Sequence, residues 1–503
     1  MSKWAAWAGK LNISAIVIKR WIFQRVERKT CARKLVKTMS LLQTIYNNDV
    51  NLYDKVKHFV DQGEDLNRIT EYGESALRVA SNNGRFDVVE LLLNAGADSS
   101  QLEWTHTISE VVFGTPDSIK KAVQETGDLE TTDFWSRTPF LFAIQLGDIE
   151  KASLLLELGA NRKAVGRCGK TAMAYAIQHN NVSMLKWLVD QGFDTESAND
   201  FQDTPLITAA SLGMSDCLKF LIDCGADIYK ANKIPERAIQ VATNMKVVRI
   251  LVDCGDDIND ISPEMHAELL GVEYDATPLV SKEAYIAGRY RQFGTSNAEA
   301  TENPFWMAMI RSGASGWRAS ETFSDSGSEP EQAIWSYQRF GRSTTILGDG
   351  RIVEIAGEHE DYYDSDFCIY NDVTVFEKNG EIRIFSYPAE LFPPTDFHTA
   401  TLVGDFIYII GSLGYPESRR PDHTPVYRLN IQSFEIDKVD TTGEIPGWIS
   451  RHKAFLNGRG EIVLRGGRKI VLENDQEDYI DNTQRYQLCL KSFVWTRLKN
   501  EGI

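Results

Sequence analysis

Short apolar stripes alternate with polar turns through the first half of the chain, at a nearly constant period. Each stripe approximates V-x-x-L-L and ends shortly before a glycine. Seven such glycines follow one another at spacings of 30 to 33 residues: Gly63, Gly96, Gly127, Gly159, Gly192, Gly225 and Gly255. A fixed period near 33 residues indicates one repeated supersecondary unit, whose apolar faces can be buried only by stacking on neighbouring copies. The pattern therefore predicts an α-helical solenoid.

The residue types within a copy predict where its helices begin and end. The copy that starts at Thr204-Pro205-Leu206 continues with Ala209-Ala210 and closes at Gly225. The threonine hydroxyl can cap the free amides of a first short helix, and proline is tolerated at that helix's first position. Small alanines let paired helices approach closely, and the terminal glycine supplies the left-handed conformation that ends the second helix.

These recurring positions resemble the ankyrin repeat over about residues 40–258, and the array is assigned to residues 39–258 with about seven repeats. The histidine that usually follows the T-P-L triplet is absent. The third copy, Trp104 to Glu130, keeps only Thr107, Ile119, Val123 and Gly127, and the first and last copies read as degraded caps. The resemblance implies an extended recognition surface for another protein and no catalytic pocket.

The second half of the chain carries a different repeat. Residues 259–337 read as a helical cap and a linker, and 313–331 within them as a loop rich in Ser, Gly and Glu. In residues 338–503, Ile352, Ile407 and Ile462 mark buried strands 55 residues apart, each ending at a glycine. The three copies resemble kelch-type blades of a β-propeller. Three blades are too few to close a propeller, so either residues 281–337 supply a fourth, or the array or a second chain protects an open stack.

Charge and cysteine content limit the classes of partner and compartment. The 503-residue chain has a net charge of −17, which argues against nucleic-acid binding. Residues 1–38 carry ten Lys and Arg and one Glu, so this arm is basic; we interpret it as disordered or as lying upstream of the true start, with a membrane-surface helix as the alternative. Its apolar run is too short to span a membrane. Seven scattered cysteines favour reduced thiols and a cytoplasmic location.

One column of aromatic residues is the leading candidate for a partner-binding surface. Three residues before each capping hydroxyl, four of five copies carry an aromatic residue, at Tyr72, Trp104, Trp135 and Phe201. In ankyrin arrays this position lies on the hairpin fingers between repeats, so we expect all four to be at least partly exposed and to anchor a partner. The alternative is that they pack on one another and steady neighbouring fingers.

No residue set in the sequence predicts catalysis, a metal or a cofactor. The acidic segment 357–366 includes His359 but lacks the spacing of a calcium loop, and His398 and His452 open equivalent strands, which indicates a structural role. The leading hypothesis is an intracellular protein-protein interaction module. One alternative is an enzyme with a polar or metal site near residues 358–366, and another is an inhibitor or immunity protein that masks a toxin. The sequence does not indicate the partner or the oligomeric state.

Overall fold

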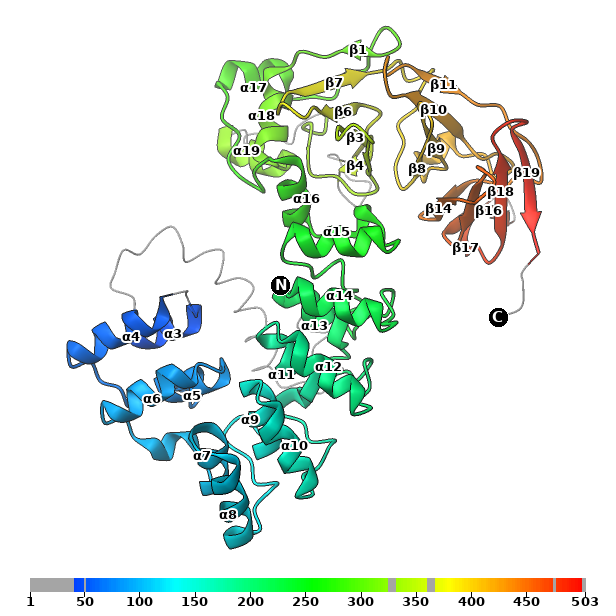
Figure 1. The fold of residues 1–503 in the computed structure, drawn as a ribbon. Coiled ribbons are helices and arrows are strands. Elements are labelled where there is room, and N and C mark those ends of the chain that lie inside the picture. The colour runs from blue at the N-terminus through cyan, green and yellow to red at the C-terminus, as the bar shows by residue number, and fades with distance from the viewer. Residues whose placement is uncertain (1–39, 49–50, 324–331, 360–366, 474–475, 500–503) are drawn as a thin grey trace. The chain divides into compact units, whose positions relative to one another are not determined.

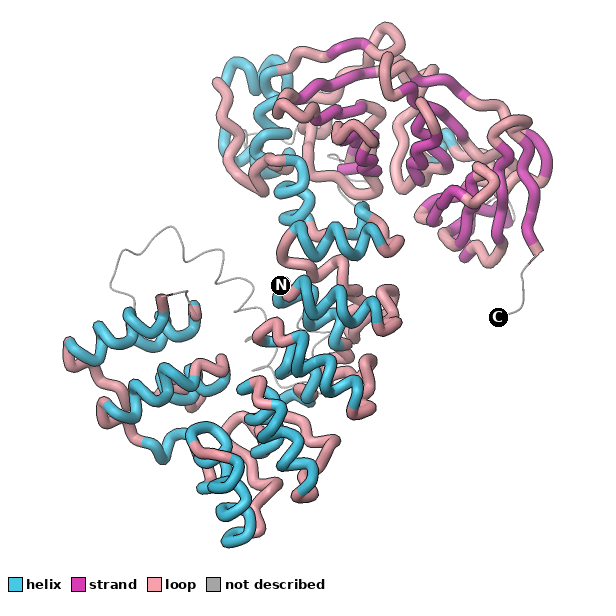
Figure 2. Tube along the Cα trace, viewed as in Figure 1, coloured by secondary structure: helices cyan, strands magenta, loops and turns pink. Residues whose placement is uncertain are grey.

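The computed structural model of the protein describes residues 40–48, 51–323, 332–359, 367–473 and 476–499 (Figure 1). Contacts divide the chain into two compact units, residues 1–200 and 201–503. The first unit is helical, and the second begins with helices and continues with strands (Figure 2). None of the helices in the described ranges is long and apolar enough to cross a membrane. The basic arm, residues 1–38, lies outside the described residues.

The described residues of the first unit form five helix pairs, one for each repeat predicted there, with short 3-10 turns between some of them. The pairs are α3 (Leu41–Asn47) with α4 (Leu52–Asp61), α5 (Ala76–Asn82) with α6 (Phe86–Asn94), α7 (His106–Phe113) with α8 (Pro116–Thr126), α9 (Pro139–Leu146) with α10 (Ile149–Glu157), and α11 (Ala172–Gln178) with α12 (Val182–Asp190); the turns are η2 (Ser99–Leu102) and η3 (Arg167–Gly169). The apolar stripe of each helix faces its neighbours, as the periodicity predicts.

The predicted caps are confirmed in the well-kept repeats. The hydroxyls of Ser75, Thr138 and Thr204 accept hydrogen bonds from the backbone N–H three residues later, at 3.2 to 3.4 Å. All seven period glycines have φ between 68° and 100°. A Cβ at Gly159 would meet nothing within 4 Å, so the backbone conformation alone calls for glycine there.

The third repeat uses a different cap from the one predicted. Its first helix, α7, begins at His106, and the Thr105 hydroxyl accepts from the backbone N–H of Ile108 at 3.2 Å. Thr107 is buried inside the helix. The register of this repeat is therefore shifted by two residues from the expected one, because the sequence offers two threonines and only packing selects between them.

The second unit begins with the end of the helical array and continues into a helical layer. Its helices are α13 (Pro205–Leu212), α14 (Ser215–Asp223), α15 (Met245–Asp253), η4 (Ile258–Asp260), α16 (Pro263–Leu270), α17 (Lys282–Gly288), α18 (Pro304–Ser312), α19 (Gly316–Phe323) and the later turn η5 (Pro416–Ser418). The expectation of a loop over 313–331 is wrong for residues 316–323. Ala319 is fully buried there and Phe323 stacks on Tyr285, so tertiary contacts stabilise α19 despite its polar composition.

Within the described ranges three large sheets follow, each built on a four-stranded antiparallel meander, and the first and third have a fifth strand at one edge. The first contains β2 (Ser343–Ile346), β3 (Ile352–Ile355), β6 (Val373–Phe376) and β7 (Ile382–Ser386), with β1 (Glu299–Ala300) added at its edge; the second contains β8 (Thr399–Val403), β9 (Phe406–Ile410), β10 (Val426–Asn430) and β11 (Ile436–Lys438); the third contains β14 (Lys453–Leu456), β15 (Ile462–Arg465), β18 (Arg485–Cys489) and β19 (Val494–Leu498), with β12 (Thr442–Gly443) parallel to β19. The 55-residue period thus corresponds to one sheet.

Smaller sheets are formed largely by the segments between the second and third strands of the first and third meanders. They are the pair β4 (Glu358–His359) with β5 (Cys368–Ile369), and the three strands β13 (Ile449–Ser450), β16 (Arg468–Glu473) and β17 (Gln476–Asp481). Figure 1 shows the three large sheets following one another through residues 343–498. No closed barrel or closed propeller is formed by the strands of the described ranges.

Alternate residues of the first two sheets enter cores on opposite faces. Ile352 packs with the helical layer, where Trp306 stacks on Trp335 at 4.9 Å between ring centroids, whereas Val353 packs against the second sheet. In the second sheet, Ile409 packs against the first sheet and Ile410 packs against the third. Helices therefore cover the outer face of the first sheet, and the continuous apolar runs arise because both faces are buried.

The end of the helical array meets the strands through polar contacts within the second unit. Lys453 of β14 lies 2.7 Å from Asp257 and 3.0 Å from Asp260, and the Asn259 side chain accepts from the backbone N–H of Thr344 in β2 at 2.6 Å. Segment η4 therefore bridges the first strands of the first and third sheets. This contact supports the expectation that the array protects part of the open stack.

A buried carboxylate, Glu354 of β3, forms the centre of a second polar cluster at this junction. Its oxygens lie 2.7 Å from His266 Nε2 and 3.2 Å from Arg342 Nη1, and the Tyr337 hydroxyl donates to it at 2.8 Å. Burial favours the neutral acid, but the charge of Arg342 and then His266, with the hydrogen bonds from His266 and Tyr337, lowers the pKa of Glu354 to about 2.

Candidate functional site

The structure places the four predicted anchor residues in different environments. Tyr72 is 59% exposed on its finger, and Phe201 is half-buried. Trp135 is only 5% exposed, and its indole N–H donates to the backbone carbonyl of Arg78 at 2.9 Å. The expectation that Trp135 is exposed is therefore wrong, because its ring closes the gap to an earlier repeat. Whether any of the four contacts a partner stays a prediction.

Trp104 does not occupy the same position as the other three. Since Thr105 caps α7, Trp104 stands one residue before the cap, whereas Tyr72 and Trp135 stand three before theirs. Its half-buried ring lies in an aromatic cluster with Phe86, Phe113 and Phe142, at 5.3 to 6.3 Å between centroids. Its indole N–H is buried and has no hydrogen-bond partner among the described residues. Trp104 thus packs between repeats.

A buried ion pair at the start of the fourth repeat also contacts the second repeat. Arg137 and Asp133 have side chains that are 0% and 1% exposed, and Arg137 Nη2 lies 2.6 Å from Asp133 Oδ2. The same guanidinium donates to the Ser81 carbonyl at the end of α5 at 2.7 Å and to Gln145 Oε1 in α9 at 2.6 Å. Because a buried charge must be paired and hydrogen-bonded, Arg137 fixes these two repeats against each other.

Two glutamines extend this connection to the fifth repeat. Gln145 and Gln178 both donate from Nε2 to the backbone carbonyl of Asn82, at 2.9 and 3.0 Å. Lys170 donates to Gln178 Oε1 at 2.6 Å and lies 4.1 Å above the Tyr175 ring. Burial and the nearby Arg137 charge lower the pKa of Lys170 to about 7. One continuous polar network therefore links repeats two, four and five.

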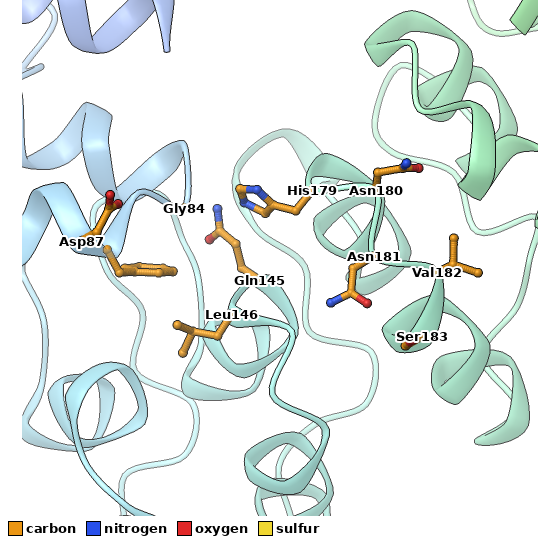
Figure 3. A pocket seen from close by; sticks show the side chains of 10 residues that line it. Gly84, Asp87, Gln145, Leu146, His179, Asn180, Asn181, Val182 and Ser183 are labelled. Atoms are coloured by element: carbon orange, nitrogen blue, oxygen red, sulfur yellow. The ribbon is translucent and has the colours of Figure 1, made fainter. Parts of the chain in front are cut away.

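A pocket of about 700 Å³ opens beside this network (Figure 3). Its walls come from the turns that join the two helices of repeats two, four and five, and consist of Gly84, Phe86, Asp87, Gln145, Leu146, His179, Asn180, Asn181, Val182 and Ser183. In Figure 3 the His179 ring lies between Gly84 and the Asn180–Asn181 turn, with Gln145 beside it. A Cβ at Gly84 would collide with the His179 ring, so glycine there permits this close approach.

The chemistry of the pocket is that of a polar recognition surface. Burial, together with the charges of Lys170 and Arg85, lowers the pKa of His179, which keeps its imidazole neutral near pH 7. A neutral imidazole and the Ser183 hydroxyl each offer a donor and an acceptor, whereas the buried Gln145 amide is already engaged by Asn82 and Arg137. Asp87 is paired with Arg85 at 2.7 Å and contributes little net charge. Such a surface suits the hydrogen-bonding groups of a polypeptide.

The candidates of the β region have mainly structural environments. Glu358 and His359 are buried in β4, while residues 360–366 of the acidic segment lie outside the described residues. His398 Nε2 lies 2.8 Å from Ser343 Oγ, and His452 Nε2 lies 3.0 Å from Thr399 Oγ1. Each histidine thus joins its sheet to the preceding one. Burial lowers the pKa of both to about 3.

The residues of the polar network were not identified from the sequence. No motif in the sequence sets Arg137, Asp133, Gln145 and Gln178 apart from the other polar residues of the repeats. The one available signal was positional, since Gln145 and Gln178 are 33 residues apart and so equivalent in consecutive repeats. That signal predicts a shared face but not the contact with Asn82, which lies across from both.

Comparison with known families supports the assignment of the helical array. Residues 72–102 match the model of a single ankyrin repeat, and residues 108–199 and 184–262 match the model of ankyrin repeats in three copies. No kelch model matches the three sheets, so their kelch-like character stays a prediction. A comparison with curated proteins finds no significant match. The repeats with their capped helices, period glycines and finger turns are ankyrin repeats over residues 72–102 and 108–262 of this chain.

Proposed function

We propose that this protein is a non-enzymatic binding protein that recognises a partner protein through the fingers and the inner pocket of its ankyrin repeats. Ankyrin repeats generally serve as protein-protein interaction modules. The observation that carries the proposal is the pocket bounded by Gln145 and His179, because its neutral donors and acceptors suit polypeptide recognition. The Arg137 network holds the walls of this pocket in place before any partner binds.

Tyr72 and Phe201 remain candidate anchors within this proposal. The Tyr72 side chain is large, amphipathic and mostly exposed to solvent. Tyrosines of this kind often contribute a large share of the binding energy in protein-protein interfaces. Trp104 and Trp135 instead pack between repeats, and we propose that this packing fixes the fingers that carry the binding surface. The three sheets are proposed to be kelch-like blades, and the free cysteines of the described ranges agree with a cytoplasmic location.

Affinity purification with the full-length chain, followed by mass spectrometry, tests this proposal. The bait is compared with its Tyr72→Ala and His179→Ala variants, which alter one exposed finger residue and one pocket residue. We expect the wild-type chain to capture a defined protein that both variants lose, with a decrease in affinity of about 2 kcal/mol at a hot-spot residue. Cross-links from the captured protein should fall on the turns that line the pocket.

Glu90→Ala is the matched control, because Glu90 is exposed on α6 in the same repeat as Tyr72 but on its outer helix. This variant should capture the same protein as the wild type. Equal capture by all three variants, with cross-links confined to residues outside 40–258, contradicts the proposed surface. Circular dichroism on each variant establishes that the helical repeats are intact.

A further inference from the structure

A second, smaller pocket lies where the three 55-residue repeats converge. Three glycines with left-handed backbones end the second strand of each large sheet, at Gly357, Gly411 and Gly467. The residues just after them, Glu358, Leu413 and Arg468, line a pocket of about 230 Å³ together with Phe367, Ser450, Arg451 and Tyr479. Each 55-residue repeat therefore contributes to one shared wall, because Glu358, Leu413 and Arg468 are each about 55 residues apart.

Gly341, Phe397 and Arg451 occupy equivalent positions, two residues before the first strand of each large sheet. Backbone hydrogen bonds join these three residues into a ladder beside the pocket. The Phe397 backbone N–H donates to the Gly341 carbonyl, and the Arg451 N–H donates to the Phe397 carbonyl, both at 2.8 Å. All three residues have positive φ, at 62°, 45° and 56°. The Arg451 guanidinium lies 3.3 Å above the Phe397 ring centroid. Left-handed backbone at non-glycine residues is uncommon and concentrates at functional sites.

The Arg451 side chain makes no ion pair or hydrogen bond with the residues that the structure describes. Among the described residues, Arg468 on the neighbouring wall lies 3.4 Å from the Tyr479 carbonyl, 3.7 Å from Asp481 and 5.5 Å from the centroid of the Tyr479 ring. Burial lowers the pKa of Arg451, the nearby Glu358 and Asp396 carboxyls raise it in part, and the Arg468 charge lowers it again. Two arginines share this pocket with one lining carboxyl, Glu358, so the lining carries one more positive than negative group and is well placed to hold an anion between the guanidiniums.

The rest of the wall is fixed by groups that are already paired. Arg419 is buried and donates to Glu477 at 2.7 Å and to the Tyr479 hydroxyl at 2.8 Å, which positions the Tyr479 ring. Asp396 lies behind Glu358 and accepts from Gly414 N at 2.6 Å and Ser412 Oγ at 3.0 Å. Burial raises the pKa of Asp396. The wall formed by Glu358 and Asp396 is therefore less negative than two ionised carboxylates would make it.

We propose that this pocket binds a carboxylate group, held by Arg451 and Arg468, on a ligand no larger than an amino-acid side chain. A guanidinium matches a planar carboxylate through two parallel hydrogen bonds, and Phe367, Leu413 and Tyr479 supply apolar and aromatic surface for a short carbon chain. The volume is below that of typical drug-sized sites, which range from about 300 to 1,000 Å³. A free dicarboxylate and a glutamate side chain in a partner protein share this chemistry.

Isothermal titration calorimetry on the full-length protein tests the proposal with two probes, glutarate and the peptide acetyl-Gly-Glu-Gly-amide. We expect saturable binding that weakens about tenfold or more in Arg451→Gln and in Arg468→Gln, and that weakens with added salt. Arg468 is 51% exposed, so its substitution leaves the fold intact even if Arg451→Gln disturbs the ladder. Arg497→Gln, at a residue 57% exposed on β19, is the matched control and should bind as the wild type does.

The comparison of probes identifies the source of the carboxylate. Equal affinity for both probes indicates a free small molecule, and about tenfold tighter binding of the peptide indicates a partner segment. Glu358→Gln should strengthen binding of either probe, because it removes a negative charge from the wall. Weaker binding by that variant, tighter binding of inorganic phosphate than of both carboxylates, or no saturable binding of either up to about 10 mM overturns the proposal.

Discussion

The Glu354 cluster at the junction between helices and strands allows a quantitative prediction. Replacing Glu354 with Gln keeps its size but removes the charge that pairs with Arg342 and that accepts from His266. At least one buried donor then loses its acceptor, and the Arg342 guanidinium keeps its charge without a carboxylate. Removing one member of a buried pair costs about 3 to 5 kcal/mol. We therefore expect Glu354→Gln to destabilise the second unit substantially.

The pKa of Glu354 gives an independent magnitude. A pKa lowered from 4.5 to about 2 corresponds to about 3 kcal/mol of stability at neutral pH, at about 1.4 kcal/mol for each pH unit. Because the folded pKa lies below the unfolded one, this contribution is fully present above about pH 4.5 and is lost as the pH falls towards 2. In Glu354→Gln that part of the acid dependence should disappear.

Urea unfolding followed by tryptophan fluorescence provides the assay, since Trp306 and Trp335 are buried in the adjoining core. The free energy of unfolding is measured at pH 7 and at several values below pH 4.5 for wild type, Glu354→Gln and the exposed control Glu390→Gln. The control should match the wild type at every pH. A loss below about 0.5 kcal/mol in Glu354→Gln, with an unchanged acid dependence, would refute the assignment of Glu354 as a paired, ionised group.

Three further predictions address the repeats and the sheets. Gly159→Val should lower the free energy of unfolding by about 1 to 2 kcal/mol through backbone strain alone, measured by circular dichroism; an unchanged transition means that φ is not left-handed there. Trp135→Ala should cost about 3 kcal/mol in the same assay because the ring is buried, and loss of partner affinity at unchanged stability would restore the anchor hypothesis. The free energy of unfolding of the wild type, measured with urea, should decline between pH 6.5 and 3, because the buried histidines resist protonation that the unfolded chain accepts. His398→Gln and His452→Gln should each make this decline smaller. An unaltered decline shows that these histidines are not the groups responsible.

Local signals in the sequence predicted the repeats and their boundaries. The period glycines have left-handed backbones, and Ser75, Thr138 and Thr204 cap helices where expected, because capping and helix termination depend on residues only a few positions apart. The 55-residue spacing likewise predicted one sheet per copy. Each of these features follows from the conformational preference of single residues and from periodicity, which a sequence displays directly.

Tertiary structure alone decided which side chains meet. Trp135 is buried because an earlier repeat offers the Arg78 carbonyl to its indole, 57 positions away, and Trp104 leaves the aromatic column because packing selects Thr105 as the cap. Helix α19 forms inside a segment with loop-like composition because the surrounding core buries Ala319. In each case contacts distant in sequence outweigh a local preference worth only a fraction of a kcal/mol per residue.

The two candidate binding sites illustrate the same division. The sequence by itself determined that Gln145 and Gln178 are equivalent, and that Glu358, Leu413 and Arg468 each follow a strand-ending glycine. It did not determine that the first pair reaches Asn82, or that the second set surrounds one pocket with Arg451. Repetition places equivalent residues on a common face, but the stacking of whole repeats sets the distance between faces, and this distance depends on the sum of many weak contacts.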